Sequence, residues 1–130
     1  MFTRRLSLVC IAALTMFAAG TAQALVIKPF TVAELDAAQK AGSSVALHFH
    51  ADWCPTCRAQ DKALETLKND PALKNVTLLQ ADYDQEKALK KALNIRTQST
   101  FVVFKGKTEV ARSAGITEAD KIKATLATGL

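Results

Sequence analysis

The apolar positions of this chain recur with two different periods, and the two periods alternate along the sequence. Short apolar runs bounded by polar residues are typical of buried strands, whereas apolar residues three and four positions apart are typical of helices. Strands are therefore expected at 45–49, 76–81, 100–104 and 108–112, with an edge strand near 25–27. With their caps included, helices are expected from Thr31 to about Ala41, Ala59 to Leu67, Asp84 to Asn94 and Thr117 to Leu126.

Capping residues mark the starts of three of these helices. Thr31 and Thr117 each stand three residues before an acidic residue, which is the spacing of a capping box. Asp84 is the expected N-cap of the third helix. Strands that alternate with helices imply parallel pairing, and the hairpin turn at 105–107 implies an antiparallel pair. The sequence thus predicts an α/β fold, a mixed four- to five-stranded sheet with helices on both faces.

Residues 1–24 are typical of a cleaved signal peptide rather than of a folded domain. Arg4 and Arg5 precede an apolar run of 14 residues, and Ala22-Gln23-Ala24 follows as a small-x-small cleavage site. The run is shorter than the roughly 18 to 20 apolar residues of a membrane span, although an uncleaved signal anchor is the alternative. We therefore predict cleavage after Ala24 and one domain over residues 25–130.

Charge and cysteine content restrict the function of that domain. Of the 17 Lys and Arg, 15 lie beyond the leader against 12 Asp and Glu, so a net charge of +3 is spread along the chain. Such mild basicity does not indicate a nucleic-acid partner. Cys10 lies in the leader, so Cys54 and Cys57 are the remaining pair. A single C-x-x-C closes too short a loop to stabilise a fold, and it fits either redox chemistry or half of a metal site.

The segment Trp53-Cys54-Pro55-Thr56-Cys57 stands where a strand ends and a helix begins. Unpaired amides and the helix dipole stabilise an anion there, so the Cys54 thiolate is favoured over its thiol. Only the thiolate attacks a disulfide, and Cys57, one turn further on, can resolve the mixed disulfide. Pro55 suits the first helical position. Trp53 is expected to shield the pair, and Thr56 can donate a hydrogen bond to the Cys54 thiolate.

These features resemble the thioredoxin superfamily. The resemblance is carried by residues 45–57, 77–84 and 94–107 and covers nearly all of the chain beyond the leader. Within the superfamily, the stretches 51–54 and 69–84 are most similar to the C-terminal thioredoxin-like domain of the periplasmic thiol:disulfide interchange protein. The resemblance implies a thioredoxin fold, with Cys54 as the attacking thiol and Cys57 as the resolving thiol.

Three positions depart from the superfamily pattern. Ser99 stands where a cis-proline usually precedes the strand beside the active site. Since a cis bond before a non-proline residue costs about 3–4 kcal/mol, we expect the Gln98-Ser99 bond to be trans. His48 stands at the position of a buried acid, and it is either a base for the Cys57 thiol or a core histidine bonded to backbone. Gln80 replaces the lysine that often pairs with that acid.

His50 opens an alternative interpretation. It lies two residues after His48, so both imidazoles are on one face of the strand. Together with Cys54 and Cys57 they form a possible set of four ligands for zinc, copper(I) or an iron–sulfur cluster. Otherwise His50 is a half-exposed polar residue at the rim of the site. A metal carrier or sensor is therefore the alternative to a redox enzyme that needs no cofactor.

The sequence predicts a periplasmic thiol-disulfide oxidoreductase, acting as a protein-disulfide reductase or isomerase. Its expected partners are disulfide-bearing protein substrates and a membrane or periplasmic redox partner, with no nucleic acid, and a monomer is expected. A third possibility is a folded module that keeps the motif but recruits a partner through its surface. The direction of electron flow is not predicted, because oxidants and reductants share this scaffold.

Overall fold

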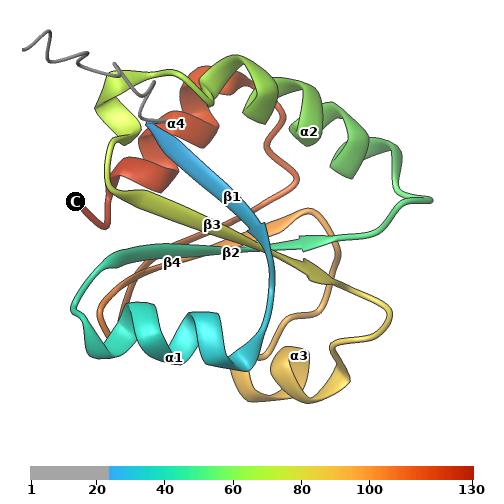
Figure 1. The fold of residues 1–130 in the computed structure, drawn as a ribbon. Helices are drawn as coiled ribbons and strands as arrows, with labels where there is room; N and C mark the ends of the chain where they lie inside the picture. Colours follow the sequence, from blue (N-terminus) through green and yellow to red (C-terminus); the bar gives the residue numbers. More distant parts are fainter. Residues whose placement is uncertain (1–23) are drawn as a thin grey trace, which may run out of the picture.

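Helices cover both faces of a five-stranded mixed sheet in the computed structural model, which describes residues 24–130 (Figure 1). In chain order the elements are β1 (Leu25–Pro29), α1 (Val32–Lys40), β2 (Ser44–His50), α2 (Pro55–Leu67), the 3-10 turn η1 (Pro71–Leu73), β3 (Val76–Asp82), α3 (Lys87–Leu93), β4 (Thr100–Lys105), β5 (Thr108–Ala114) and α4 (Ala119–Ala127). Within residues 24–130 no helix is long and apolar enough to span a membrane. Apart from Ala24, the predicted signal peptide lies outside the described residues.

The strand order of the sheet is β1-β3-β2-β4-β5. β1 and β2 both pair parallel with β3, whereas β4 pairs antiparallel with β2 and with β5. The predicted mixed sheet and its edge strand are therefore confirmed. β2 is the central strand, and residues 44–49 are all buried. The segment that follows its carboxyl end therefore starts from the most enclosed part of the sheet.

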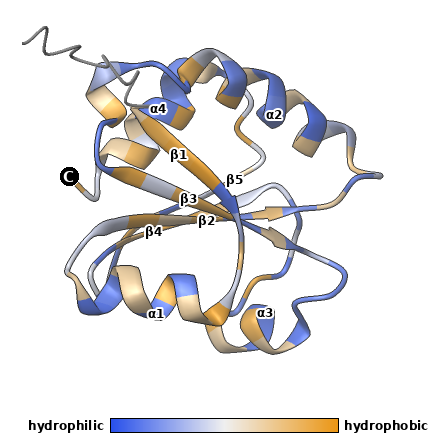
Figure 2. Cartoon of the chain, in the orientation of Figure 1, coloured by the Kyte–Doolittle hydropathy of each residue, from blue (hydrophilic) through white to orange (hydrophobic). Residues whose placement is uncertain are grey.

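Two apolar layers lie on opposite faces of the sheet, because successive side chains of a strand point to opposite sides. Ala46, Leu64 and Ile122 belong to the layer beneath α2 and α4. Leu47 and Val102 belong to the layer beneath α1 and α3. In Figure 2 the apolar colour follows the strands and the inner sides of the helices. The sheet with its two layers is thus the rigid support on which the loops at its end are held.

The ends of α1 and α3 contain two of the predicted signals. The Thr31 hydroxyl accepts a hydrogen bond from the Glu34 amide at 3.1 Å, as expected of an N-cap. The Glu34 carboxylate does not complete the box, because it accepts from Lys28 at 3.4 Å. Asn94 ends α3 in the left-handed conformation, with φ of 54°.

The predicted N-cap Asp84 is wrong, and α3 begins at Lys87 instead. The Asp82 carboxylate accepts from the amides of Asp84 and Gln85 at 2.8 and 3.2 Å, and this turn delays the helix. Asp84 Oδ2 instead accepts from the Trp53 indole at 2.8 Å.

The predicted cap of the last helix is also wrong. Glu118, not Thr117, is the N-cap residue of α4, and no side chain caps this helix. The Glu118 carboxylate accepts from the Thr117 amide at 3.2 Å and from Lys121 at 2.7 Å. These contacts move the start of the helix one residue beyond the predicted one.

Candidate functional site

The chain places Cys54 at the N-terminus of α2. β2 ends at His50, a turn brings the Cys54 amide to 3.1 Å from the Ala51 carbonyl, and α2 starts at Pro55. Cys54 is the N-cap residue, and its Sγ accepts a hydrogen bond from the Cys57 amide at 3.2 Å. The apolar spacing that begins at Ala59 therefore misses the first turn of the helix, which the motif itself forms. The predicted position of the pair at a helix start is confirmed.

The two thiols differ in acidity. Burial opposes the charged form of Cys54, yet hydrogen bonds to its sulfur from Cys57, Ser99 and Gln98 outweigh burial and lower the pKa of this thiol. Burial, together with the hydrogen bond to Cys54, raises the pKa of the Cys57 thiol. The negative charge therefore forms on Cys54 while Cys57 keeps its proton. This is the order that a nucleophile followed by a resolving thiol requires.

The side chain of Ser99, the residue before β4, contacts the sulfurs of both cysteines. Its Oγ lies 3.1 Å from Cys54 Sγ and 3.1 Å from Cys57 Sγ, although the residue is more than 40 positions away in the sequence. The backbone of Ser99 has φ of 62°, a left-handed conformation that few non-glycine residues adopt. Among residues 24–130 no peptide bond is cis, so the expected trans Gln98-Ser99 bond is confirmed.

The backbone of Ser99 is fixed on both sides. Its amide donates to the Phe49 carbonyl at 2.8 Å, and its carbonyl accepts from the Gly115 amide at 3.0 Å. The same carbonyl accepts from Gln60 Nε2 at 3.0 Å. Gln60 Nε2 also donates to the Ile116 carbonyl at 2.8 Å. These bonds hold the Ser99 hydroxyl at the sulfurs, and they add to the site a residue, Gln60, that the sequence analysis missed.

The hydrogen bonds of Gln60 also decide which ring nitrogen of His48 carries the proton. Because the Gln60 amide nitrogen donates to two carbonyls, its oxygen must accept from His48 Nε2, 2.8 Å away. His48 therefore carries its proton on Nε2, and its buried Nδ1 has no hydrogen-bond partner. Burial is the main cause that lowers the pKa of His48 to about 4, so the ring is neutral at neutral pH. The expected bond to backbone is replaced by this bond to a side chain.

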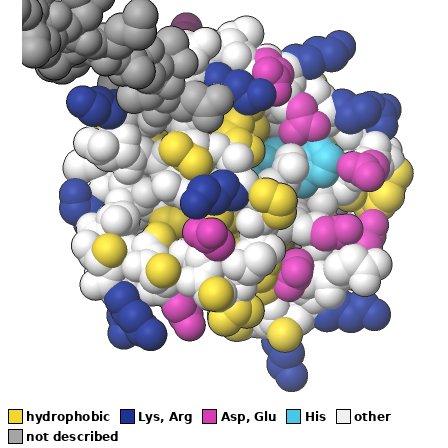
Figure 3. Space-filling model, viewed as in Figure 1, with side chains coloured by type: hydrophobic (Ala, Val, Ile, Leu, Met, Phe, Trp, Pro, Cys, Tyr) yellow, Lys and Arg dark blue, Asp and Glu magenta, His cyan; other side chains and the backbone are white. Residues whose placement is uncertain are grey.

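His50 lies at the rim of the site, but its side chain is 12% exposed rather than half-exposed as expected. Its Nε2 lies 2.8 Å from the Asp61 carboxylate, and its Nδ1 lies 3.7 Å from that of Asp52. Gln80 donates to the same Asp61 carboxylate at 3.3 Å. Figure 3 shows a histidine surface next to acidic side chains on this face of the molecule. Gln80 therefore belongs to a rim network with His50, and the usual lysine–acid pair has no counterpart there.

The alternative metal site is not supported by the geometry. Among the residues that the structure describes, no group of three or more His, Cys, Asp or Glu side chains is arranged to hold a metal ion. The Nε2 atom of His48 is engaged by Gln60, and that of His50 by Asp61. Cys54, Cys57, His48 and His50 are neighbours without forming one ligand set.

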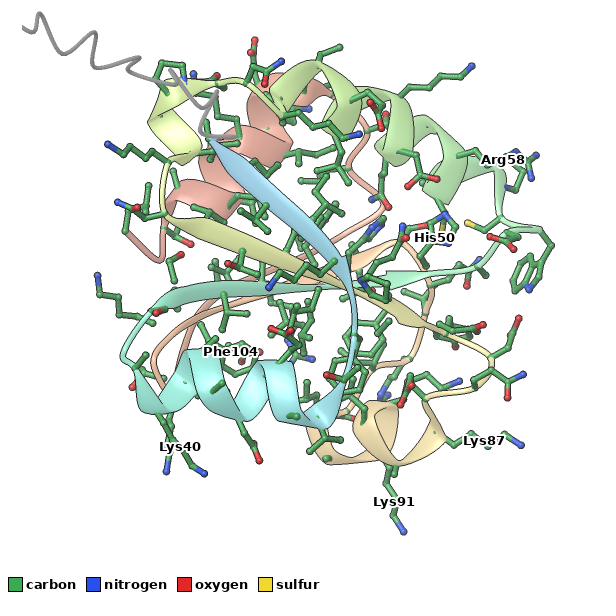
Figure 4. All side chains as sticks on the ribbon, in the orientation of Figure 1. Lys40, His50, Arg58, Lys87, Lys91 and Phe104 are labelled. Atoms are coloured by element: carbon green, nitrogen blue, oxygen red, sulfur yellow. The ribbon has the colours of Figure 1, made fainter. Side chains whose placement is uncertain are left out.

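The residues around the cysteines differ in exposure. Trp53 is 57% exposed, and its hydrogen bond to Asp84 holds it at the surface. Arg58 donates to the Asp52 carbonyl at 2.9 Å and projects away from α2 at the end of the sheet where His50 lies (Figure 4). Cys54 itself is only 1% exposed. The Cys54 sulfur must therefore become more exposed before a protein substrate can reach it.

Thr56 does not make its predicted contact. The hydrogen-bond partners of the Cys54 sulfur are Cys57, Ser99 and Gln98, and Thr56 is not one of them. Thr56 is half-buried and lies between the two cysteines in the first turn of α2.

An acidic thiol that caps a helix, with a second thiol one turn away, defines the class of protein as a thiol-disulfide oxidoreductase.

Comparison with known proteins identifies the family. The thioredoxin family model matches residues 26–128. Thioredoxin from Chlamydia trachomatis serovar D is 30% identical over 82 residues, which cover 63% of this chain and 78% of that protein. Among solved structures, Trxlp from Edwardsiella tarda EIB202 is 30% identical with a TM-score of 0.73, covering 77% of this chain and 97% of that chain. A mutant thioredoxin from Halobacterium salinarum NRC-1 is 27% identical with a TM-score of 0.67. The match covers 85% of this chain and 98% of that chain.

The chain therefore belongs to the thioredoxin family. The predicted thioredoxin fold and the predicted thiol-disulfide oxidoreductase are both confirmed at this level. The finer resemblance to the C-terminal domain of the interchange protein stays a prediction.

Proposed function

We propose that the protein is an exported, periplasmic thiol-disulfide oxidoreductase that reduces or isomerises disulfides in other proteins. The observation that carries this proposal is the contact of 3.2 Å between the Cys57 amide and Cys54 Sγ at the start of α2. It places the sulfur of lowered pKa at the positive end of a helix and its partner one turn away. Export is supported by the signal-like composition of residues 1–24.

The reaction has two exchange steps. The Cys54 thiolate attacks one sulfur of a substrate disulfide, forms a mixed disulfide and releases the other substrate sulfur as a thiolate. Cys57 then loses its proton to solvent and attacks Cys54 Sγ, which forms the Cys54–Cys57 disulfide and releases the second substrate thiolate. Solvent protonates the released thiolates, so the substrate has gained two electrons and two protons. A partner dithiol must reduce the protein again before the next cycle.

Trapping the mixed disulfide tests this function. In Cys57→Ser the attacking thiol remains while the resolving thiol is gone, so a disulfide-bonded protein substrate should stay covalently attached to Cys54. Non-reducing electrophoresis and mass spectrometry detect the adduct. The matched control is Cys54→Ser, in which the buried thiol of raised pKa should attach little substrate. Absence of any adduct in Cys57→Ser, with a wild type that does not reduce the same substrate, refutes the proposed function.

The periplasmic location is tested separately. Expression of the full chain in a bacterium, followed by periplasmic extraction, should yield a protein whose first residue is Leu25. Ala22→Leu with Ala24→Leu removes the small residues of the cleavage site and should leave the longer chain attached to the membrane. A wild-type chain that stays in the cytoplasm at full length would contradict export while leaving the chemistry of the pair intact.

A further inference from the structure

We propose that Ser99 is a catalytic residue of this exchange, and that its hydroxyl stabilises the dithiol form and raises the reduction potential of the Cys54–Cys57 pair. The inference rests on the proposed function, since it concerns the same two sulfurs. It starts from one observation, a single hydroxyl at 3.1 Å from both of them. A proline at this position has no hydroxyl, so the contact is a property of this chain.

The direction of each hydrogen bond follows from the charges. A serine hydroxyl has one proton to donate and lone pairs with which to accept. When Cys54 is ionised its sulfur can only accept, so Ser99 donates to Cys54. The Cys57 thiol keeps its single proton, which its hydrogen bond to Cys54 uses. The hydroxyl of Ser99 thus lies within reach of both sulfurs and donates to the one that carries the negative charge.

The same hydroxyl can follow the charge through the reaction. When Cys54 enters the mixed disulfide, its sulfur becomes neutral and a weak acceptor. Ser99 can then rotate its proton toward Cys57 and stabilise the thiolate that forms there as the Cys57 proton leaves to solvent. The exchange itself stays as described above, and Ser99 ends it with the proton with which it began. No bond to Ser99 is made or broken.

The effect on the potential follows from the difference between the two end states. In the reduced pair Ser99 donates to the charged sulfur of Cys54, and a hydrogen bond to a charged group is stronger than a neutral one. The disulfide offers two neutral sulfurs, which are weak acceptors. Ser99 therefore favours the dithiol, and a pair whose dithiol is stabilised is a weaker reductant. Within the proposed function this favours isomerisation over net reduction.

Two substitutions remove the hydroxyl with different backbone consequences. Ser99→Gly relaxes the backbone, because glycine adopts φ of 62° without strain. Ser99→Ala keeps a Cβ at that same φ. Both variants should favour the disulfide in equilibrium with glutathione by about tenfold, which is about 30 mV toward more negative potential. Both should also move the titration of Cys54, followed by the ultraviolet absorbance of its thiolate, to higher pH, because Ser99 is one of the groups that lower this pKa.

A second serine supplies the control. Ser113 lies on β5 opposite Phe101, and its buried hydroxyl has no hydrogen-bond partner. Ser113→Ala should leave the glutathione equilibrium and the thiolate absorbance at wild-type values. Should Ser99→Ala fail to fold, Ser99→Gly carries the comparison alone.

The outcomes separate this inference from the function on which it rests. A shift toward the disulfide in Ser99→Gly, absent in Ser113→Ala, supports the inference. A wild type that equilibrates with glutathione together with an unchanged Ser99→Gly overturns the role of Ser99 and leaves the proposed function standing. A wild type that forms no Cys54–Cys57 disulfide at all overturns both.

Discussion

The buried imidazole of His48 should make the stability of the protein depend on pH. Burial, as the largest cause, lowers its pKa from 6.5 to about 4 in the folded state, and the hydrogen bond to Gln60 only partly opposes it. An unfolded histidine still titrates near 6.5. As the pH falls through this interval, the unfolded chain binds a proton that the folded protein does not. Acid therefore favours unfolding, and the contribution of neutral His48 is complete only above the unfolded pKa.

The magnitude follows from the same pair of pKa values. A pKa that falls from 6.5 to about 4 corresponds at full effect to about 3 kcal/mol of unfolding free energy. Between about pH 7.5 and about pH 5 the loss should reach about 2 kcal/mol. Water does not reduce this value by screening the charge, because His48 is 0% exposed. Such a loss is a large fraction of the roughly 5–15 kcal/mol that stabilises a typical domain.

Urea unfolding of the reduced protein at these two pH values measures the effect. His48→Phe keeps an aromatic ring against Phe101, whose own ring is stacked on His48 at 4.5 Å, but cannot titrate. It is destabilised at every pH because the Gln60 oxygen loses its donor, so the comparison uses only the change between the two pH values. Between the higher and the lower pH, wild type should lose about 2 kcal/mol more free energy of unfolding than His48→Phe.

The neighbouring histidine provides the control for this experiment. His50→Gln leaves the buried imidazole of His48 in place. Its free energy of unfolding should therefore still change more between the two pH values than that of His48→Phe. Equal pH dependence in wild type and His48→Phe refutes the assignment of a strongly lowered pKa to His48. So does a pH dependence that disappears in His50→Gln instead.

Three further substitutions test the supports of the fold by urea unfolding. Gln60→Leu leaves buried hydrogen-bonding groups without a partner and should cost about 3 kcal/mol, whereas exposed Gln85→Ala should change the free energy of unfolding by less than about 0.5 kcal/mol. Thr31→Ala should cost about 1 kcal/mol, and an equal cost for Thr117→Ala, which caps no helix, would contradict the observed caps. Asn94→Ala should cost about 1 kcal/mol because of its φ of 54°, whereas Asn94→Gly should cost nothing; equal losses would contradict this.

The elements of the fold could be predicted because each depends on residues close in sequence. The apolar run around Val45 has no competing helical period, and it forms the central strand. Cys54 could be placed at a helix start because Pro55 suits only the first turn. The two wrong caps, Asp84 and Thr117, have the same local chemistry as a true cap. They fail because the carboxylates of Asp82 and Glu118 engage the nearby amides first.

The polar centre of the site could be predicted only in part. The position of Gln60 on the buried side of α2 was readable, since it lies three residues after Cys57 and four before Leu64. Its partners were not readable, because Ser99 and Ile116 reach it from distant loops. The sequence likewise shows that a serine replaces proline at position 99. Only the folded chain shows that its hydroxyl contacts both sulfurs.

The near-complete enclosure of Cys54 has a consequence for its chemical survival. Peroxide and other small oxidants attack thiolates in proportion to their ionisation and their accessibility. An acidic thiol open to solvent would be prone to overoxidation to sulfinic acid, from which thiols rarely recover. With an exposure of 1%, Cys54 is largely shielded from such oxidants. Enclosure thus lets a strong nucleophile persist without being consumed by the oxidants around it.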